Sequence, residues 1–207
     1  MQESYILMGD VILSAEKDSR ELMRNLKLEV NRINSDYRQF VESPLTITLG
    51  DEFQGVLKSL KSCISAIFEL DRRLLAYNFD LRYSINYGEI DTEINEKEAY
   101  EMLGSGLTKA REKLNALKKS RSRIEVSGLK DGIKMDRLNN AFRLYQSIYD
   151  DWKKKDRGVA YELIANNNYK QVAPLFDRDP SSMWRKRESL KIEEYRIAKA
   201  LILSLAS

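Results

Sequence analysis

The stretch Leu49-Gly50-Asp51-Glu52-Phe53-Gln54-Gly55 decides the fold, because it places two acidic residues between two short apolar segments. These segments cover residues 45–49 and 53–57, and a Gly-Asp pair between them is typical of a tight turn, so we expect a β-hairpin. A second such pair, Gly9-Asp10, interrupts an apolar run that begins at Tyr5 and predicts a buried strand. If that strand lies beside the hairpin, Asp10 and Asp51 face each other across one cleft.

Apolar periodicity gives the other elements of this first region. Apolar residues recur at spacings of three and four in two segments, which predicts helices, and they alternate in a third segment, which predicts a strand. The expected order is a strand over 5–13, a helix over 17–37, the hairpin strands 45–49 and 53–57, a helix over 58–76 and a strand over 79–90. This β-α-β-β-α-β order predicts an α+β, ferredoxin-like fold.

Three regions are expected along the chain. A helix over 106–119 and a short strand over 123–127 complete the first region, which we place at 1–130. A connecting helix follows at 131–155, and a small all-α region follows at 156–207. Residues 152–207 carry 12 Lys and Arg against 7 Asp and Glu, a net charge of +5, whereas the rest of the chain carries −2. A basic C-terminal region indicates an anionic partner, nucleic acid first, and a solvated helical surface is the alternative.

Composition narrows the chemistry. The chain has no histidine and only one cysteine, Cys63, which excludes histidine-based nucleophile systems, disulfides and cysteine-based zinc sites. Chemistry would therefore depend on carboxylates, Lys, Arg, hydroxyl groups and a hard metal ion. No apolar stretch reaches the length of a membrane span, and the N-terminus lacks the pattern of a signal peptide, so we expect a cytoplasmic protein.

The acidic residues of the two Gly-Asp pairs suggest a metal site. Asp10 and Asp51, with Glu52 beside them, are hard oxygen ligands suited to Mg²⁺ or Mn²⁺, which would in turn bind a nucleoside triphosphate. The alternative is that Asp10 caps a turn and that Asp51 and Glu52 are ordinary hairpin residues.

Four motifs resemble those of class III nucleotide cyclases, and their order resembles the palm domain of diguanylate cyclases. They are Gly9-Asp10-Val11-Ile12, Gly50-Asp51-Glu52-Phe53, the strand motif from Arg82 to Glu89, and Gly106-Leu107-Thr108-Lys109-Ala110-Arg111. The resemblance implies that Asp10, the carbonyl of Val11, and Asp51 bind metal and that Arg111 contacts phosphate. It also implies a homodimer, because class III cyclase sites usually form between two protomers. The whole chain resembles the SatD family of bacterial proteins.

One position departs from the cyclase pattern. The cyclase asparagine four residues before the arginine is replaced by Leu107, which cannot make its hydrogen bond. Catalysis requires stronger binding of the transition state than of the substrate, so this departure favours nucleotide binding without turnover. In an active enzyme, Arg111 or Lys109 would neutralise charge on the phosphoryl oxygens; a solvated helix face is the alternative for both. Ser14 and Lys17, at the start of the first predicted helix, are candidates for phosphate binding.

The C-terminal region has the pattern of a helix-turn-helix. One helix is expected over 158–165 and a second over 169–176, with Asn168 as its N-cap and Gln171 completing a capping box. Pro174 argues against a regular second helix. Asp179 and Pro180 predict a clean start for a third helix.

The beginning of that third helix is the predicted DNA-binding surface. Ser181, Ser182, Arg185 and Lys186 would lie at its exposed start, and Trp184 would pack inward. The alternative is a helical bundle used for dimerisation, which the apolar stripe of the last helix would also suit.

Three functions are therefore open. The chain is a nucleotide-responsive regulator that binds DNA, a metal-dependent nucleotidyl cyclase or nucleotidyltransferase that releases pyrophosphate, or a non-catalytic dimeric adaptor. Leu107 favours the first function over the second, and the acidic residues Asp10, Asp51 and Glu52 argue against the third.

Overall fold

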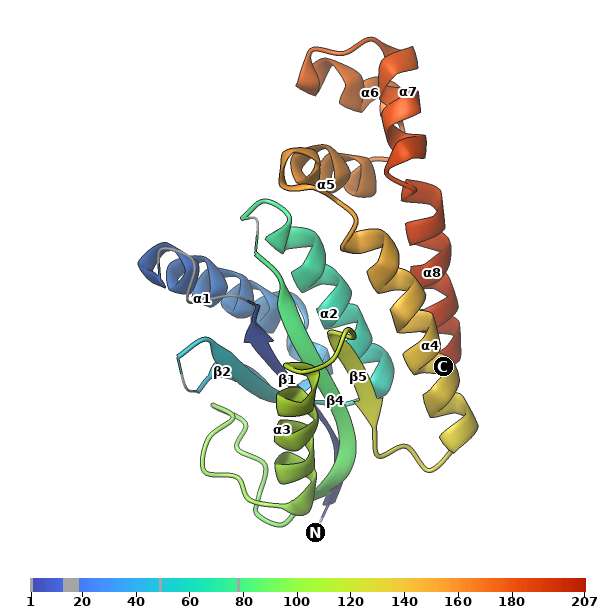
Figure 1. Cartoon of the computed structure of the whole chain (residues 1–207). Helices are drawn as coiled ribbons and strands as arrows, with labels where there is room; N and C mark the ends of the chain where they lie inside the picture. Colours follow the sequence, from blue (N-terminus) through green and yellow to red (C-terminus); the bar gives the residue numbers. More distant parts are fainter. Residues whose placement is uncertain (1, 13–18, 49, 78) are drawn as a thin grey trace.

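The computed structural model describes residues 2–12, 19–48, 50–77 and 79–207, and it is built around one five-stranded sheet (Figure 1). The strands are β1 (Gln2–Val11), β2 (Val41–Ile47), β3 (Glu52–Leu57), β4 (Leu81–Ile90) and β5 (Ile124–Ser127). Their order across the sheet is β2-β3-β1-β4-β5. Only β4 and β5 run parallel; the other neighbours are antiparallel. The first four strands and their two helices confirm the predicted ferredoxin-like arrangement.

Helices cover both faces of the sheet. Helices α1 (Ser19–Asp36) and α2 (Leu60–Leu74) pack on one face, and α3 (Ser105–Leu117) packs on the other. Alternation along β1 supplies both layers, since Leu7 and Val11 join the larger apolar cluster with α1 and α2, whereas Ile6 and Met8 join the smaller cluster under α3. The polar residue Asp10 therefore lies on the α3 face, in line with Ile6 and Met8.

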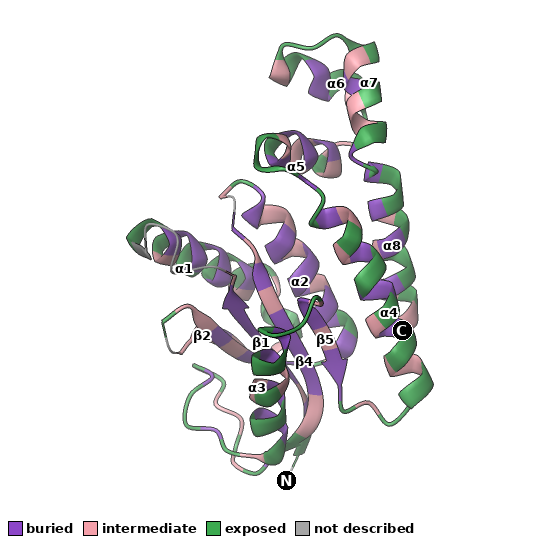
Figure 2. Ribbon diagram, viewed as in Figure 1, coloured by how far each residue is buried: buried purple, intermediate pink, exposed green. Residues whose placement is uncertain are grey.

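The C-terminal helices extend the larger core. They are α4 (Gly132–Tyr149), α5 (Arg157–Ala165), α6 (Tyr169–Val172), α7 (Pro180–Ser189) and α8 (Ile192–Leu205). Helix α8 packs along α4 and reaches α2, and α6 and α7 lie at the end of the molecule farthest from the N-terminus (Figure 1). Buried residues run without a break from the sheet into α4 and α8 (Figure 2), so the apolar core continues across the predicted boundary near residue 130. None of the helices in the described ranges is long and apolar enough to cross a bilayer.

Strand β2 begins earlier than the predicted residue 45. It starts at Val41, directly after the short 3₁₀ helix η2 (Arg38–Phe40), and contains Pro44. The pairing of β2 with β3 shifts register on both sides of Ser43, and β2 lies at the edge of the sheet. An edge strand with bulges tolerates proline, which explains why the apolar pattern alone missed the first half of this strand.

A buried ionic cluster joins α2 to the far end of the sheet. Asp71 of α2 is fully buried, and its two carboxylate oxygens accept hydrogen bonds from Tyr83 (2.9 Å), Tyr145 (2.9 Å) and two nitrogens of Arg123 (2.9 and 3.2 Å). Its backbone carbonyl accepts from the hydroxyl of Tyr149 (2.8 Å). Both carboxylate oxygens of Asp71 are thus paired within the protein, as a buried charge requires.

Candidate functional site

Helix α3 lies close to the sheet because two glycines meet where it crosses β4. A Cβ added to Gly106 would lie 2.7 Å from the carbonyl carbon of Gly88, and a Cβ added to Gly88 would lie 2.8 Å from Cα of Gly106. Asn86 of β4 fixes the crossing, since its Nδ2 donates to the carbonyl of Gly106 (3.0 Å) and its Oδ1 accepts from Ser127 (2.8 Å). These contacts hold α3 over β1 and β4 and set where its side chains reach the sheet.

Two carboxylates lie together beneath the C-terminal end of α3. Asp10 of β1 and Glu52 of β3 are direct partners in the antiparallel pairing of these strands, so their side chains share one face. The Nζ of Lys118, the residue that follows α3, lies 3.3 Å from Oδ2 of Asp10 and 3.4 Å from Oε1 of Glu52. Asp10 is buried and Glu52 is partly exposed. The two carboxylates are therefore close enough to share a single cation.

Two arginines complete this site. Nη1 of Arg82, on β4, lies 3.4 Å from both carboxylate oxygens of Asp10. Nη1 of Arg111 lies 3.3 Å from Oε2 of Glu52, and its Nη2 lies 3.3 Å from Oε1 of Gln54. All of these contacts are longer than the ~2.7–2.9 Å of a strong charge-assisted hydrogen bond. The site thus holds three cations and two carboxylates in loose contact.

The charges of this site act on each other's pKa values. Burial raises the pKa of Asp10, and the charges of Arg82 and Lys118 offset only part of that effect. Partial burial lowers the pKa of Lys118, but the carboxylates of Asp10 and Glu52 outweigh it, and the net pKa is raised. Lys118 is therefore an ammonium at neutral pH. Because burial makes the ionised form of Asp10 costly, a divalent cation would stabilise that form more than the single charge of Lys118 does.

The structure places the predicted metal ligands as follows. Glu52, and not Asp51, is the register partner of Asp10; Asp51 lies one residue earlier, in the turn before β3. Val11 is the buried last residue of β1, and metal binding by its carbonyl stays a prediction. The predicted phosphate ligands Ser14 and Lys17 lie outside the described residues.

The two predicted catalytic residues lie on different sides of α3. Arg111 points toward β3, whereas Lys113 points toward β5, where its Nζ lies 2.8 Å from Glu125. Lys109 is one helical turn before Lys113 and is exposed, so it shares the β5 side and lies away from the acidic pair. Of the two alternatives, Arg111 is the one that contacts Glu52, and a catalytic role for either residue stays a prediction.

Sequence reasoning missed Arg82 and Lys118. A signal existed for Lys118, because it follows Arg111 by seven residues and two helical turns return a side chain to the same face. A signal also existed for Arg82, which alternates with the apolar residues Leu81 and Tyr83 and must lie on the polar face of β4. Neither pattern shows which carboxylate each cation meets.

A cavity of about 420 Å³ opens beside Arg111. Its apolar part includes Met8, Met102 and Leu107, and its polar rim includes Gln54 and Asn115. Leu107, which replaces the cyclase asparagine, is buried in the small apolar cluster under α3 with Met8 and Met102. The leucine thus forms part of the apolar wall of this cavity.

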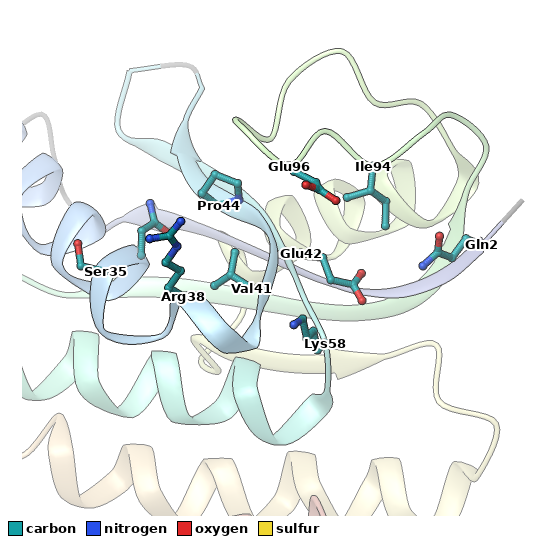
Figure 3. Close-up of a pocket in the computed structure, with 10 residues that line it drawn as sticks. Gln2, Ser35, Arg38, Val41, Glu42, Pro44, Lys58, Ile94 and Glu96 are labelled. Atoms are coloured by element: carbon teal, nitrogen blue, oxygen red, sulfur yellow. The ribbon is translucent and has the colours of Figure 1, made fainter.

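A larger cavity of about 740 Å³ lies at the β2 edge, at the opposite end of β1 from Asp10 (Figure 3). It is lined by side chains of both charges, among them Arg38, Glu42, Lys58 and Glu96. This larger cavity is therefore not part of the candidate site.

The predicted helix starts in the C-terminal region are confirmed, with one correction. Asp179 caps α7 by accepting from the amide of Ser182 (2.9 Å), and Asn168 caps α6 by accepting from the amide of Lys170 (3.1 Å). The predicted capping box is wrong, because the side chain of Gln171 accepts from Nδ2 of Asn166 (3.1 Å) instead of returning to Asn168. The second helix changes to a 3₁₀ helix, η4 (Ala173–Phe176), as the proline in this segment predicts.

The predicted DNA-binding residues differ in their exposure and in their contacts with the rest of the protein. Ser181 and Arg185 are exposed and Ser182 is half-buried, but Nζ of Lys186 lies 2.7 Å from Oδ1 of Asp156, the last residue of the 3₁₀ helix η3 (Lys154–Asp156). Lys186 is therefore held against the protein. The expectation that Trp184 packs inward is wrong, since 48% of its surface is exposed.

Comparison with solved structures finds distant matches. A structure of a bacterial light-regulated adenylyl cyclase matches with 14% identity and a TM-score of 0.43, over 60% of this chain and 74% of that one. A second structure of a bacterial light-regulated adenylyl cyclase matches with 14% identity and a TM-score of 0.41, over 60% of this chain and 42% of that one. The Csm1-Csm4 cassette in complex with cA4 matches with 14% identity and a TM-score of 0.42, over 97% of this chain and 36% of that one.

A search of curated proteins gave no match. The sequence match to a family is extensive, because residues 5–200 align with the family model. That range takes in the sheet, the acidic pair, Arg111 and Lys118, and most of the C-terminal helices. By this match the chain belongs to the SatD family.

Proposed function

We propose that this protein binds a nucleoside triphosphate or signalling nucleotide together with Mg²⁺, and that it acts as a nucleotide-responsive regulator. One observation carries the proposal: a single cation, Nζ of Lys118, lies within 3.4 Å of carboxylate oxygens from both Asp10 and Glu52. Two carboxylates that share an ammonium ion are positioned to share a metal ion. Mg²⁺ and Mn²⁺ prefer such oxygen ligands.

The residues present fit a metal that brings part of its own coordination shell. Within the described ranges, no group of three or more Asp, Glu, His or Cys side chains gathers to enclose a metal ion. Mg²⁺ usually keeps several waters and is bound by one or two carboxylates together with substrate phosphates. Asp10 and Glu52 would supply those carboxylates, with Asp51 and the carbonyl of Val11 as further candidates. The metal would contribute charge neutralisation at the phosphates.

The surrounding cations fit a triphosphate. Arg82, Arg111 and Lys118 contact the two carboxylates, which leaves one net positive charge before any metal enters. A divalent metal ion would make the site strongly positive, and an anionic phosphate chain would balance it. Arg111 is partly exposed, and its guanidinium can form paired hydrogen bonds to phosphate.

The cavity beside Arg111 fits a nucleotide base. Its apolar wall at Met8, Met102 and Leu107 would contact the faces of a planar ring, and the amides of Gln54 and Asn115 lie at its rim. A few polar groups around an apolar cavity are the usual composition of small-molecule sites.

Leu107 favours binding over turnover. A hydrogen bond that exists only in the transition state raises the rate, and a buried leucine cannot donate one. The second candidate, a nucleotidyl cyclase or nucleotidyltransferase that releases pyrophosphate, is favoured by the position of Arg111 next to Glu52. An arginine there could neutralise charge that builds on the phosphoryl oxygens.

The proposed output of the regulator is DNA binding. The first turns of α7 present Ser181, Ser182 and Arg185 at the end of the molecule remote from the sheet, and a helix start of this kind can enter a DNA groove (Figure 1). Exposed Trp184 is available for contact with a partner, which includes a second copy of the chain. A homodimer is part of the proposal.

The deciding experiment incubates purified protein with each nucleoside triphosphate and either Mg²⁺ or Mn²⁺. Bound nucleotide and released pyrophosphate are measured together, with Asp10→Ala as the control. Metal-dependent binding without pyrophosphate, lost in Asp10→Ala, is the expected result. Pyrophosphate release by the wild type that is abolished in Asp10→Ala would establish a nucleotidyl cyclase or nucleotidyltransferase. If the wild type binds no nucleotide, the non-catalytic adaptor is the remaining function.

A matched pair of variants tests which hairpin carboxylate holds the metal. Glu52→Gln should lose metal-dependent nucleotide binding, because Glu52 is the carboxylate opposite Asp10. Asp51→Asn changes the neighbouring turn residue by the same single charge. Loss of binding in Asp51→Asn with normal binding in Glu52→Gln would return the ligand role to Asp51.

A further inference from the structure

Lys118 occupies a particular position in the proposed metal site. It immediately follows α3, two turns after Arg111, and it contacts both carboxylates of the acidic pair. Arg82 and Arg111 alone would balance the charges of Asp10 and Glu52, and Lys118 adds one net positive charge. That charge lies where a shared metal ion would lie.

The contacts of Lys118 with the two carboxylates are long for ion pairs. Its distances of 3.3 and 3.4 Å exceed the 2.8 Å between Lys113, which lies on α3, and Glu125 of β5. The two lysine side chains are similarly exposed, at 42% for Lys118 and 39% for Lys113. Exposure therefore does not explain the longer contacts. Lys118 is divided between two carboxylates, whereas Lys113 contacts one.

We infer that Lys118 is a built-in counter-ion that keeps a bare metal ion out of the site and moves onto the phosphates when metal and triphosphate arrive together. The inference rests on the proposed function. A divalent ion alone would have to displace Lys118 into solvent beside Arg82 and Arg111, whose charges repel the metal. With a triphosphate present, the flexible lysine stem lets the displaced ammonium pair with phosphate oxygens.

This arrangement couples the two ligands. Triphosphate gives the displaced Lys118 a new anionic partner, so it lowers the cost of metal entry. By linkage, metal raises the affinity for triphosphate by the same factor. The protein would then respond to the metal–nucleotide complex and not to free Mg²⁺.

The test uses Mn²⁺ alone and the preformed complex of Mn²⁺ with inorganic tripolyphosphate, a probe that carries the phosphates without a base. Binding of each to the full-length protein is followed by calorimetry, and free Mn²⁺ is counted by electron paramagnetic resonance. The variants are Lys118→Met, which keeps the length of the stem and removes the charge, and Lys113→Met as the matched control on the same helix.

Lys118→Met should bind Mn²⁺ alone about tenfold more tightly than the wild type, a change of ~1.4 kcal/mol. It should bind the Mn²⁺–tripolyphosphate complex more weakly, because the phosphates lose their lysine. Lys113→Met should change neither affinity. A purely structural role for Lys118 would move the melting temperature but would not produce these opposite changes.

The outcomes separate this inference from the proposed function. If the wild type binds the complex and Lys118→Met binds Mn²⁺ alone no more tightly, the counter-ion role is overturned and the nucleotide site stands. If neither protein binds Mn²⁺ or the complex, the proposed function fails and the inference fails with it. Lys118→Gln, which keeps a polar side chain, replaces Lys118→Met if the methionine variant does not fold.

Discussion

Two ionic clusters, one around Asp71 and one around Asp10 and Glu52, lie on opposite faces of the same sheet and differ in their contact distances and in the exposure of their cations. Consecutive residues of β4 reach both, since Tyr83 donates to Asp71 on one face and Arg82 contacts Asp10 on the other. Asp71 is fully buried and paired at 2.8–3.2 Å. The contacts of the acidic pair are 3.3–3.4 Å, and two of its three cations, Arg111 and Lys118, are 39% and 42% exposed.

The difference shows how the same residue types serve two purposes. Around Asp71, tyrosine hydroxyls and Arg123 leave no room for another ligand, and burial raises the pKa of Tyr83 well above its ordinary range, with the charge of Asp71 adding to it. Around Asp10 and Glu52, the contacts are longer, and under the proposed function the cations give way to a metal ion and phosphates. Satisfied buried networks stabilise one packing, and loosely paired charges at an opening leave capacity for a ligand.

The largest expected effect is on the closed cluster. Asp71→Ala should lower the free energy of unfolding by ~3–5 kcal/mol, because it leaves Arg123 buried without its main partner. Urea denaturation measures the loss. Asp150→Ala is the matched control, since it removes a second, 41% exposed carboxylate from the same arginine and should cost less. Equal losses in the two variants would mean that burial does not set the strength of this cluster.

The open cluster should show the reverse behaviour, with ligand binding changed more than stability. Arg111→Ala should weaken metal-dependent nucleotide binding about tenfold, through loss of a charge-assisted contact worth ~1.5 kcal/mol. Lys109→Ala removes an equal charge from the other side of α3 and should leave the affinity unchanged. The two are compared by calorimetry in the same buffer. Equal effects would mean that α3 acts through its overall charge and not through the side facing Glu52.

A lysine at the margin of the closed cluster tests the electrostatic argument through pH. Nζ of Lys199 lies 4.8 Å from the ring centre of Phe68 and 5.5 Å from that of Tyr195, and burial lowers its pKa from the ordinary 10.5. The carboxylates of Glu69 and Asp71 oppose that change, and Arg72 and Arg196 add to it. The folded state therefore binds this proton less readily than the unfolded state does.

The unfolding free energy of the wild type should accordingly rise with pH in the window below pH 10.5, relative to Lys199→Met. At neutral pH the variant should be the more stable protein, by ~0.5–2 kcal/mol. Urea denaturation at pH 7 and at pH 9.5 gives both values. A difference between the two proteins that does not shrink as the pH rises would show that the charge of Lys199 is not the cause.

Much of the fold could be predicted from local patterns. The alternation of β4 and the helical spacing of α1 and α2 predicted buried faces that the structure confirms, and Asp179 and Asn168 marked helix starts correctly. The predicted start of β2 was wrong because Pro44 is normally a break signal, and only the position of β2 at the bulged sheet edge makes it acceptable.

The candidate site was predictable only in part, because it depends on register and on a helix crossing. A change of one residue in strand pairing moves a side chain to the other face, so sequence could not decide between Asp51 and Glu52. The partners of Lys118 depend on where α3 crosses the sheet, and that crossing is set by the contact between Gly88 and Gly106. Local spacing predicts the face of its own helix or strand on which a side chain lies. It does not predict which other element packs against that face.

The smallest expected effect is on DNA binding by α7, which contains one paired and one exposed basic side chain. Lys186 is paired with Asp156 at 2.7 Å, whereas neighbouring Arg185 is exposed and contacts Ser181 of its own helix at 3.4–3.5 Å. If α7 binds DNA as proposed, Arg185→Ala should weaken binding and reduce the salt dependence by about one phosphate contact. Lys186→Ala should leave the salt dependence unchanged and lower stability slightly. Fluorescence anisotropy with duplex DNA at several salt concentrations compares the wild type with the two variants. Loss of an arginine that contacts a phosphate must reduce the number of counterions released on binding. Equal salt slopes in the three proteins would therefore mean that α7 does not contact DNA.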